Sequence, residues 1–281
     1  MSGKFENVII VTDLDGTYIA KTEDGEKRNR EKIEYFKANG GHFTFATGRN
    51  ISHILGSIPD ATDVVNLPIV CCNGAYLYDM KSRKELSGYT MSPEAVFSMI
   101  EKFNELAEAP ECHGAGTRRN IACRRKDLAI GDPMEYLHPV FDKNIDGIRS
   151  MEEWKNYRIY KCVFFGDGDP TTVIRERMDP IFQKDFSILQ ASPRYYEYHA
   201  KGVSKGAMIS EMMSLVFGNR KMTLCVAGDF DNDVEMLKRA DIAICPENAS
   251  YPVKSICHKQ MCHHQKGLMG DIVDYLDKLY K

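Results

Sequence analysis

Two carboxylates near the start of the chain have a spacing that could do chemistry. Asp13 and Asp15 lie in the segment DLDGT, directly after the apolar run of residues 7–12, and Gly16 allows a sharp turn behind them. If strand geometry continues, side chains two residues apart point the same way, and the carboxylates repel unless a cation or a shared proton compensates. One could then act as a nucleophile and the other as a general acid and base. The alternative is a polar turn that ends a strand.

A second acidic segment, GDFDND, holds three carboxylates where a strand is expected to turn into a helix. These are Asp229, Asp231 and Asp233. Mg²⁺ takes one or two carboxylates together with water and substrate oxygens, so this segment suits a hard cation. An EF-hand is excluded, because Val234 and Ala240 stand where that motif needs Gly and Glu. Acidic residues at a helix start also serve as caps, so not all three need be ligands.

Two further segments carry groups that suit a bound anion. In ATGR, Thr47 offers a hydroxyl and the amides after it open an expected helix, which makes Gly48 and Arg49 candidate substrate-binding residues. In KGVSKG, Lys205 lies in the first turn of another expected helix, where a cation opposes the helix dipole. A lysine that neutralises a bound anion explains this position better than a structural role does. Taken alone, Thr-Gly is equally typical of a plain turn.

All four segments fall where a strand ends or a helix begins. Short apolar runs predict the strands, and helical spacing predicts the helices between them. The strands are residues 7–12, 42–47, 68–72, 222–227 and 242–245, and the helices are residues 28–39, 50–58 and 204–217 and a segment from Asp231. This alternation predicts an α/β fold with a doubly wound parallel sheet. Ligands bind at the carboxyl edge of such sheets, so these elements would bring the four segments together.

A different pattern interrupts the alternation in the middle of the chain. A hairpin (AYLYD, MKSR, KELSGYT) precedes a long amphipathic helix with Ser92 as its N-cap and Pro93 at its first position. The elements that follow are a strand at residues 158–165, a helix after Pro170, a strand at residues 186–190 and a strand at residues 195–199, the last of which rejoins the core. We therefore predict a core domain of residues 1–82 and 193–281 and an inserted α+β domain of residues 83–192.

Composition and charge restrict the class of protein. The 281 residues are 43% hydrophobic and 27% charged, which is too apolar for disorder. The 37 basic and 40 acidic residues give a net charge of −3, whereas a general nucleic-acid binder is basic. No run approaches the ~20 apolar residues of a membrane helix, and the first residues do not resemble a signal peptide. Nine cysteines, an odd number, are typical of reduced thiols, so we expect a cytoplasmic protein without nucleic-acid or membrane partners.

Two other groups of residues, one basic and one of cysteines and histidines, are weaker candidates for a functional role. The basic run RRNIACRRK, residues 118–126, could attract anionic substrates, but charge runs are more typical of solvated surface. Near the C-terminus, five side chains could ligate a transition metal: Cys257, His258, Cys262, His263 and His264. Their spacing fits no standard zinc pattern, so an ordinary loop is favoured. His263 and His264 could instead border the mouth of the active site.

In their order and context, the four segments resemble the motifs of the haloacid dehalogenase superfamily of phosphatases. DLDGT paired with GD-x-x-ND at this separation is a specific match. The chain is most similar to the Cof-like branch, in which a cap domain is inserted between the second and third motifs. CNGAYLYD and the Asn-Ala of PENA add to the likeness. The resemblance implies a Rossmann-like core with an inserted cap, here residues 83–192.

The same resemblance implies a catalytic role for each matching acidic residue. Asp13 would be the nucleophile that forms an aspartyl-phosphate, and Asp15 would be the general acid and base. The implied Mg²⁺ group is Asp13, the backbone carbonyl of Asp15, and Asp229, with Asp233 supporting the metal or Lys205 from outside. Such an arrangement suits phosphoryl transfer, which depends on in-line positioning and charge neutralisation.

Phosphoryl binding is implied by the likeness as well. Thr47 and Lys205 would grip the phosphoryl oxygens, and Asn232 could reach them too. Tyr18 stands where the family usually has Leu, and Phe230 fills a position that is often small. Both could narrow the site, but neither removes a catalytic group.

These inferences predict a Mg²⁺-dependent phosphoric monoester hydrolase acting on small phosphorylated metabolites, with sugar phosphates favoured. A sugar phosphomutase is the alternative enzyme, because it would need the same Asp13 and Asp15. A signalling receiver domain is disfavoured, since receivers are far shorter and spread their acids over different strands. A silent binding protein is disfavoured because every catalytic position is present. The sequence leaves the individual substrate and the oligomeric state open.

Overall fold

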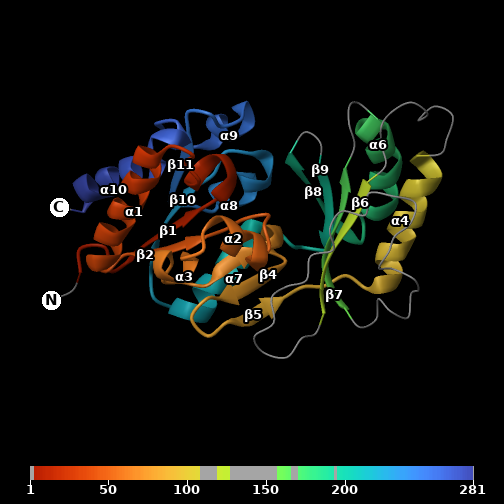
Figure 1. Ribbon diagram of the computed structural model, residues 1–281, viewed down its shortest axis with the longest axis horizontal. Helices are drawn as coiled ribbons and strands as arrows, with labels where there is room; N and C mark the ends of the chain where they lie inside the picture. The colour runs from red at the N-terminus through yellow and green to blue at the C-terminus, as the bar shows by residue number, and fades with distance from the viewer. Residues whose placement is uncertain (1–2, 108–118, 127–156, 166–169, 193–194, 281) are drawn as a thin grey trace. The chain divides into compact units, whose positions relative to one another are not determined.

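The computed structural model describes residues 3–107, 119–126, 157–165, 170–192 and 195–280. The chain forms two compact units, residues 1–87 with 204–281 and residues 88–203 (Figure 1). The four segments singled out for their chemistry contribute Asp13, Thr47, Lys205 and Asp229 to the first unit. Among the described residues, no helix is long and apolar enough to cross a membrane.

A five-stranded parallel sheet forms the centre of the first unit, in the order β12-β11-β10-β1-β2. Its strands are β1 (Val8–Thr12), β2 (His42–Phe45), β10 (Thr223–Ala227), β11 (Ile242–Pro246) and β12 (Lys259–Met261). Every neighbouring pair is parallel, and β1 is buried along its whole length. A continuous apolar run is typical of a strand covered on both faces. The predicted doubly wound parallel core is therefore confirmed.

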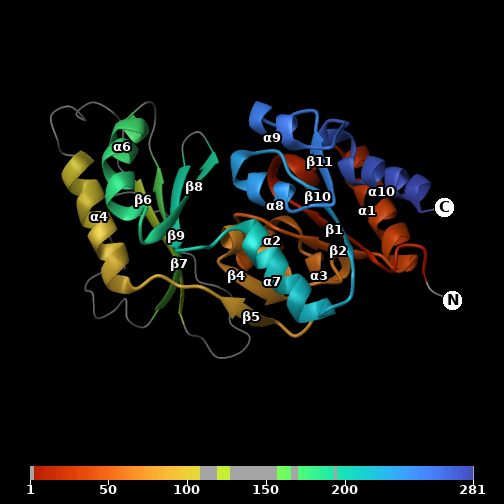
Figure 2. The ribbon, with the colours of Figure 1, turned by 180° about the vertical axis from the view of Figure 1, so that it is seen from behind.

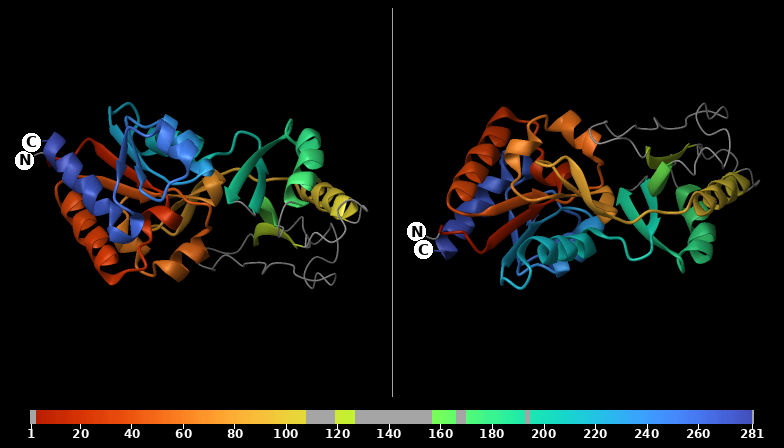
Figure 3. Two further views of the ribbon diagram at one scale, coloured as in Figure 1. Left: turned by 90° about the horizontal axis from the view of Figure 1, so that it is seen from above. Right: turned by 90° about the horizontal axis from the view of Figure 1, so that it is seen from below.

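Helices cover both faces of this sheet (Figures 1 and 2). They are α1 (Glu23–Ala38) and α10 (Leu268–Leu279) on one face, α7 (Lys205–Phe217) and α8 (Val234–Lys238) on the other, and the shorter α2 (Ile51–Ser57), α3 (Ala61–Val64) and α9 (Tyr251–Ile256). Met208 of α7 and Met236 of α8 belong to one apolar cluster with Val226 of β10. The first described residues lie beside α10 (Figure 3), where Lys4 Nζ pairs with Asp277 Oδ1 at 2.6 Å.

Helix α1 begins at Glu23. The spacing of apolar residues predicts a later start, at Arg28. Thr22 caps this earlier start, because its Oγ1 accepts a hydrogen bond from Gly25 N at 3.3 Å. Three acidic residues in the first turn add a favourable interaction with the helix dipole. Capping and charge, and not the apolar stripe, therefore decide where this helix starts.

A smaller sheet of three strands, in the order β3-β4-β5, extends the first unit. Its strands are β3 (Ile69–Cys71), β4 (Tyr76–Asp79) and β5 (Lys84–Gly88), and the last two form the predicted hairpin. An isolated parallel bridge joins Ala46 to Val70 of β3, and Thr47 N donates to Val70 O at 2.9 Å. Strand β3 thus holds the ATGR segment at the carboxyl edge of the main sheet.

The second unit is an antiparallel sheet with two helices on one face (Figure 2). Its strands are β6 (Arg119–Lys126), β7 (Tyr157–Phe165), β9 (Tyr195–Ala200) and β8 (Phe186–Ser192), in that spatial order, and its helices are α4 (Pro93–Ala107) and α6 (Pro170–Phe182). An apolar layer between helices and sheet contains Val96, Met99, Met178, Phe182, Ile159 and Tyr198. Ser92 caps α4 as predicted, because its Oγ accepts from Ala95 N at 3.2 Å.

Strand β9 corrects one expectation. The sequence rhythm places residues 195–199 in the parallel core, but β9 pairs antiparallel with both β7 and β8 in the second unit. Tyr198 faces the apolar layer, whereas Glu197 and His199 bond to each other on the opposite face at 3.1 Å. Alternation of apolar and polar side chains is typical of an antiparallel strand, whereas a strand of a parallel core reads as a continuous apolar run.

Strand β6 contains all of the basic run of residues 118–126 except Arg118, which lies outside the described residues. Strand β6 pairs with β7 and occupies an edge of the sheet that the described strands form. Charged residues on an edge strand discourage pairing with further chains. The attraction of anionic substrates by this run stays a prediction.

Candidate active site

Strands β1 and β10 bring the two acidic segments together at the carboxyl edge of the sheet. The strands are parallel and in register, with Thr12 opposite Ala227. Asp13 N continues the pairing by donating to Ala227 O at 2.9 Å. Asp13 and Asp229 are the first acidic residues after the two strands, and together with Asp233 they offer carboxylate oxygens that all lie within 4.8 Å of one another.

The turn after β1 differs from the expected continuation of the strand. Residues Leu14–Tyr18 form a tight turn in which Asp15 is extended and Gly16 has a φ of +78°. Only glycine adopts this conformation easily, and a Cβ at Gly16 would also clash with Asp229 Oδ2. Strand geometry, on which the prediction that Asp13 and Asp15 point the same way depends, therefore does not continue beyond Thr12. The Asp13 side chain is 8% exposed and the Asp15 side chain 59%.

Lys205 links two carboxylates at the centre of the site. Its Nζ donates to Asp13 Oδ1 and to Asp233 Oδ1, each at 2.6 Å, and its side chain is fully buried. Helix α7 begins at this lysine behind the N-cap Ser204, whose Oγ accepts from Ala207 N at 3.0 Å. Burial disfavours the ammonium ion, but the two carboxylates outweigh that effect and raise the pKa of Lys205. The lysine therefore stays charged at neutral pH.

The clustered carboxylates carry more negative charge than this lysine neutralises. Burial and two neighbouring carboxylates raise the pKa of Asp13 well above its usual range, against the opposing effect of Lys205. Burial and the charge of Asp233 raise the pKa of Asp229 to about 6, although Thr17 Oγ1 donates to Asp229 Oδ1 at 2.8 Å. A divalent cation between Asp13 and Asp229 would remove this repulsion.

Asp233 supports this arrangement through both of its carboxylate oxygens. Its Oδ1 accepts from Lys205, and its Oδ2 accepts from Asp229 N at 2.9 Å and Phe230 N at 3.2 Å. These bonds hold the lysine and the acidic loop in place. Asp13 and Asp229 are then the two carboxylates of this group best placed to hold a divalent cation, and two carboxylates are a usual number of protein ligands for such an ion.

Asn73 is a site residue that the sequence reasoning missed. It is fully buried with a φ of +55°, and its backbone N donates to Thr47 O at 2.8 Å. Its Oδ1 accepts from Asn232 Nδ2 at 3.0 Å, and a Cβ at Gly48 would lie 3.1 Å from its Nδ2. Asn73 therefore joins the ATGR loop to the acidic loop. The available signal is Asn-Gly directly after a strand, which marks a sharp turn.

Arg49 and Asp15 pair with each other at the surface. Arg49 Nε donates to Asp15 Oδ2 at 2.6 Å, and Arg49 Nη2 donates to Asp15 Oδ1 at 2.5 Å. Thr47 lies deeper: it is buried, and its Oγ1 accepts from Arg49 N at 3.1 Å. The structure thus brings the buried Asp13, Asp233 and Lys205 together with the half-buried Asp229, and it places Asp15 outside this group.

Other sequence-based candidates lie apart from this group. Tyr18 is buried and packs against Phe45, with ring centroids 4.8 Å apart, so the narrowing of the site by Tyr18 stays a prediction. Asp231 is exposed, and its Oδ1 accepts from Ser250 Oγ at 3.4 Å. Its position fits a helix-start acid better than a metal ligand.

The cysteines and histidines near the C-terminus bond to other groups. His258 Nδ1 accepts from Ala243 N at 2.9 Å, and His264 Nδ1 lies 2.9 Å from Ile19 O. Within the part of the chain that the structure describes, Asp13, Asp229 and Asp233 are the group able to hold a metal. The zinc alternative therefore has no support, and the placement of His263 and His264 at the site's mouth stays a prediction.

The arrangement of these segments matches a known family. The profile of haloacid dehalogenase-like hydrolases matches residues 10–269. The chain belongs to this family. The membership confirms the predicted superfamily and the predicted class of hydrolase. A curated relative, 5-amino-6-(5-phospho-D-ribitylamino)uracil phosphatase of Escherichia coli, is 22% identical over 286 residues, covering 97% of this hydrolase and 96% of the relative.

Solved structures of haloacid dehalogenase-like hydrolases have the same fold. One from Bacteroides thetaiotaomicron matches with a TM-score of 0.70 and 18% identity, covering 96% of this hydrolase and 99% of that chain. The sugar phosphatase BT4131, of subclass IIB of the superfamily, matches with a TM-score of 0.71 and 19% identity over the same shares. At these identities the likeness shows the fold, and it confirms the predicted α/β class.

Proposed function

We propose that this hydrolase is a Mg²⁺-dependent phosphatase of small phosphorylated metabolites, with sugar phosphates favoured, that works through an aspartyl-phosphate on Asp13. The observation that carries the proposal is the buried Lys205 ammonium held 2.6 Å from both Asp13 and Asp233. A carboxylate beside a permanent cation suits attack on a dianionic phosphoryl group, which needs its charge neutralised. Asp229 completes the pair of carboxylates for Mg²⁺.

The reaction then runs in two steps that regenerate the enzyme. An oxygen of Asp13 forms a bond to phosphorus while the ester P–O bond breaks in line, and Asp15 gives a proton to the departing oxygen. Asp15 next takes a proton from water, whose oxygen attacks phosphorus and releases phosphate from Asp13. Mg²⁺ held by Asp13 and Asp229 would supply positive charge for the phosphoryl oxygens.

Phosphoryl binding in this scheme is assigned to Thr47, Lys205 and Asn232. Thr47 Oγ1 and Lys205 Nζ can donate to phosphoryl oxygens, and Gly48 leaves room for the chain to approach them closely. Asn73 bonds to Asn232 and to Thr47, so it positions two of these groups at once. Asp233 keeps Lys205 charged and directed at Asp13.

The substrate class rests on two relatives. One is named a sugar phosphatase, and the name of the other denotes a phosphate ester of a ribityl chain. Both names describe phosphate on a polyhydroxylated carbon chain. We infer that residues 88–203 act as the cap that selects among such esters, and that the protein works in the cytoplasm.

Phosphate release tests the proposal. A panel of phosphorylated sugars, nucleotides and cofactors is incubated with the protein, with and without Mg²⁺, and the free phosphate is measured. We expect release that depends on Mg²⁺ and is greatest with a sugar phosphate. Isomerised sugar phosphate without free phosphate would favour the phosphomutase instead, and no product with any ester would contradict both enzymes.

A further inference from the structure

Arg49 and Asp15 form a two-point ion pair in the first unit. Arg49 Nε and Nη2 donate to the two oxygens of Asp15 at 2.6 Å and 2.5 Å. The Asp15 side chain is 59% exposed and the Arg49 side chain 25%. Both oxygens of the proposed acid and base are therefore engaged by one guanidinium.

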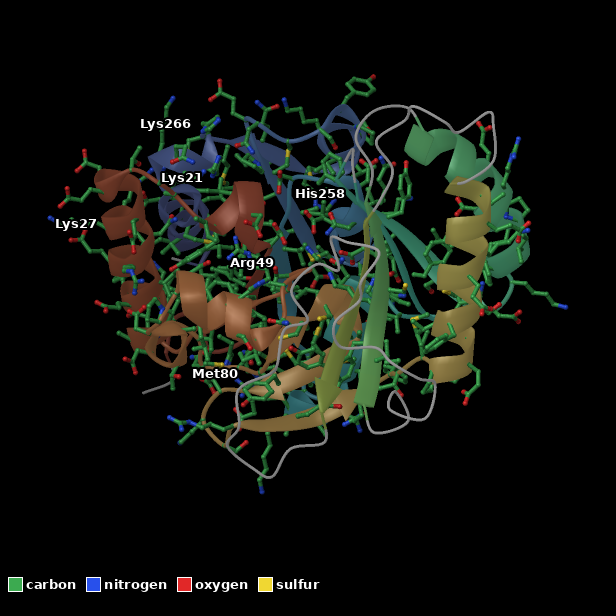
Figure 4. The ribbon with its side chains drawn as sticks, turned by 45° about the vertical axis from the view of Figure 1, so that its right-hand side comes forward. Lys21, Lys27, Arg49, Met80, His258 and Lys266 are labelled. Carbon is green, nitrogen blue, oxygen red and sulfur yellow. The ribbon has the colours of Figure 1, made fainter. Side chains whose placement is uncertain are left out.

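Helix α2 and the ATGR loop hold Arg49 from the other side. Its Nη1 donates to Ser57 Oγ and, at 3.4 Å, to His53 O, and Arg49 is labelled beside this helix in Figure 4. Its backbone N donates to Thr47 Oγ1 at 3.1 Å. Arg49 therefore pairs with Asp15 and is also part of the loop that is proposed to bind the phosphoryl group.

This pairing conflicts with the proton transfer proposed for Asp15. A general acid must give a proton from a carboxyl oxygen to the departing oxygen, whereas in this pairing both oxygens of Asp15 accept hydrogen bonds from Arg49. A guanidinium fork fits a phosphoryl group as well as it fits a carboxylate. A phosphoryl dianion carries more charge than a carboxylate, so it competes for the same fork. Exposed ion pairs are weak, so the exchange meets little resistance.

We propose that Arg49 exchanges partners during the reaction. In the resting protein it holds Asp15 aside, and when substrate binds it turns to the phosphoryl group and releases Asp15 toward the departing oxygen. The inference rests on the proposed phosphatase function. Arg49 is then a positioning residue that makes the acid available only when a phosphoryl group is present.

A double-mutant cycle on phosphate binding tests the exchange. The dissociation constant of inorganic phosphate is measured by NMR titration, at saturating Mg²⁺ and constant ionic strength, for wild type, Asp15→Asn, Arg49→Gln and the double variant. Asp15→Asn removes both the competitor for Arg49 and a nearby negative charge, so binding should tighten about tenfold. In the Arg49→Gln background only the charge effect remains, and binding should tighten about twofold.

The Arg30–Asp60 pair offers a matched control. It is a second two-point Arg–Asp pair of the same unit, between α1 and the residue before α3. Asp60→Asn should leave the phosphate dissociation constant unchanged. Arg49→Lys keeps the charge without the fork, so Asp15→Asn in that background should tighten binding by an intermediate factor.

The possible outcomes separate the exchange from the proposed function. Equal tightening by Asp15→Asn in both Arg49 backgrounds would overturn the exchange and leave the phosphatase proposal intact. A structure of the phosphate complex in which the Arg49 fork still holds Asp15 would also overturn it. A wild-type protein that hydrolyses no phosphate ester and binds no phosphate would overturn both proposals.

Discussion

Lys205 and its carboxylate partners set the electrostatics of the site at the scale of single residues. The buried ammonium donates to both Asp13 and Asp233, so one positive charge faces two carboxylates where water is excluded. Removing one member of such a group is costly, because a buried charge is left without a partner. The uncompensated negative charge on Asp13 and Asp229 gives the site its expected preference for a cation.

Replacing Lys205 with Met tests this balance. We expect Lys205→Met to lower the free energy of unfolding by about 3 kcal/mol at pH 7, because two buried carboxylates lose their cation. The loss should be smaller at pH 5, where protonation relieves the repulsion. Urea unfolding at both pH values measures the effect, with Lys201→Met, which changes an exposed lysine, as the control. Wild-type stability in Lys205→Met at pH 7 would contradict the argument.

Replacing Asp13 with Asn tests the nucleophile. The amide is nearly isosteric but cannot attack phosphorus, so we expect less than about a thousandth of the wild-type kcat with the fold intact. Steady-state phosphate release and circular dichroism provide the two measurements. More residual activity than this would argue against covalent catalysis by Asp13.

The pKa of Asp229, raised to about 6, predicts opposite effects of pH on metal binding and on stability. Mg²⁺ binds the ionised carboxylate, so the dissociation constant of Mg²⁺ should rise about tenfold for each pH unit below 6. A folded-state pKa above the unfolded value of 3.8 gives stability that is present below that value and lost as pH rises through about 6. Metal-free wild type should therefore lose stability relative to Asp229→Asn between pH 4 and 7.

Calorimetric Mg²⁺ titrations and thermal unfolding of the two proteins across this pH range check both statements. Added Mg²⁺ should restore the wild-type Tm most at the upper end of the range, because the carboxylates are ionised there. A difference in Tm that does not change with pH would show that Asp229 keeps an ordinary pKa.

At the scale of elements, tight turns hold the loops of the carboxyl edge in register. Asn73 and Gly74 both have positive φ, at +55° and +97°. Gly74 lies so close to Ser204 O that a Cβ there would clash with it. The turn between β3 and β4 is thus fixed against the start of α7, where Lys205 lies. One short turn therefore positions the ATGR loop, Asn232 and the lysine together.

Two substitutions of Asn73 separate its backbone role from its side-chain role. Asn73→Gly and Asn73→Ala both lose the hydrogen bond to Asn232, so both should lower kcat by a similar factor, about tenfold. Asn73→Ala should cost about 1 kcal/mol more stability, because alanine is strained at positive φ. Urea unfolding and steady-state kinetics give both quantities. Equal stability of the two variants would refute the backbone argument.

At the scale of the whole molecule, the chain leaves the first unit after Ser87 and returns at Ser204. Ser87 Oγ donates to Glu211 of α7, and Ser204 caps the same helix. Seven residues of α-helix span about 10 Å, so the two ends of the first unit lie close together. The first unit alone contains every residue proposed to act in catalysis.

Replacing residues 88–203 with a flexible linker of about six Gly and Ser residues tests the cap proposal. We expect the shortened protein to bind Mg²⁺ and to hydrolyse a small activated phosphate ester slowly. It should lose selectivity among natural substrates, because remote binding energy no longer orients the reacting group. The ratio of kcat/KM for the best and worst panel substrates measures this. A folded first unit that kept full selectivity would contradict the cap proposal and would indicate that residues of the first unit, such as Phe230, select the substrate.

Several features follow from residues that are close together in the sequence. The apolar run of residues 7–12 becomes β1, and Ser92 and Ser204 cap the helices expected after them. Burial of a short run and capping of a helix depend on neighbours within a few positions, so local patterns suffice. Parallel strands end at one edge, and this rule was enough to predict that Asp13 and Asp229 meet.

Only the tertiary structure decided which distant groups bond to one another. The sequence determined that residues 195–199 form a strand, but their neighbours are β7 and β8 of the second unit. It likewise indicated Asp15 and Arg49 as candidate site residues without showing that they pair, and it did not reveal the position of Asn73. Each outcome depends on side chains far apart in the chain, whose approach is fixed by the packing of the whole fold and not by any local pattern.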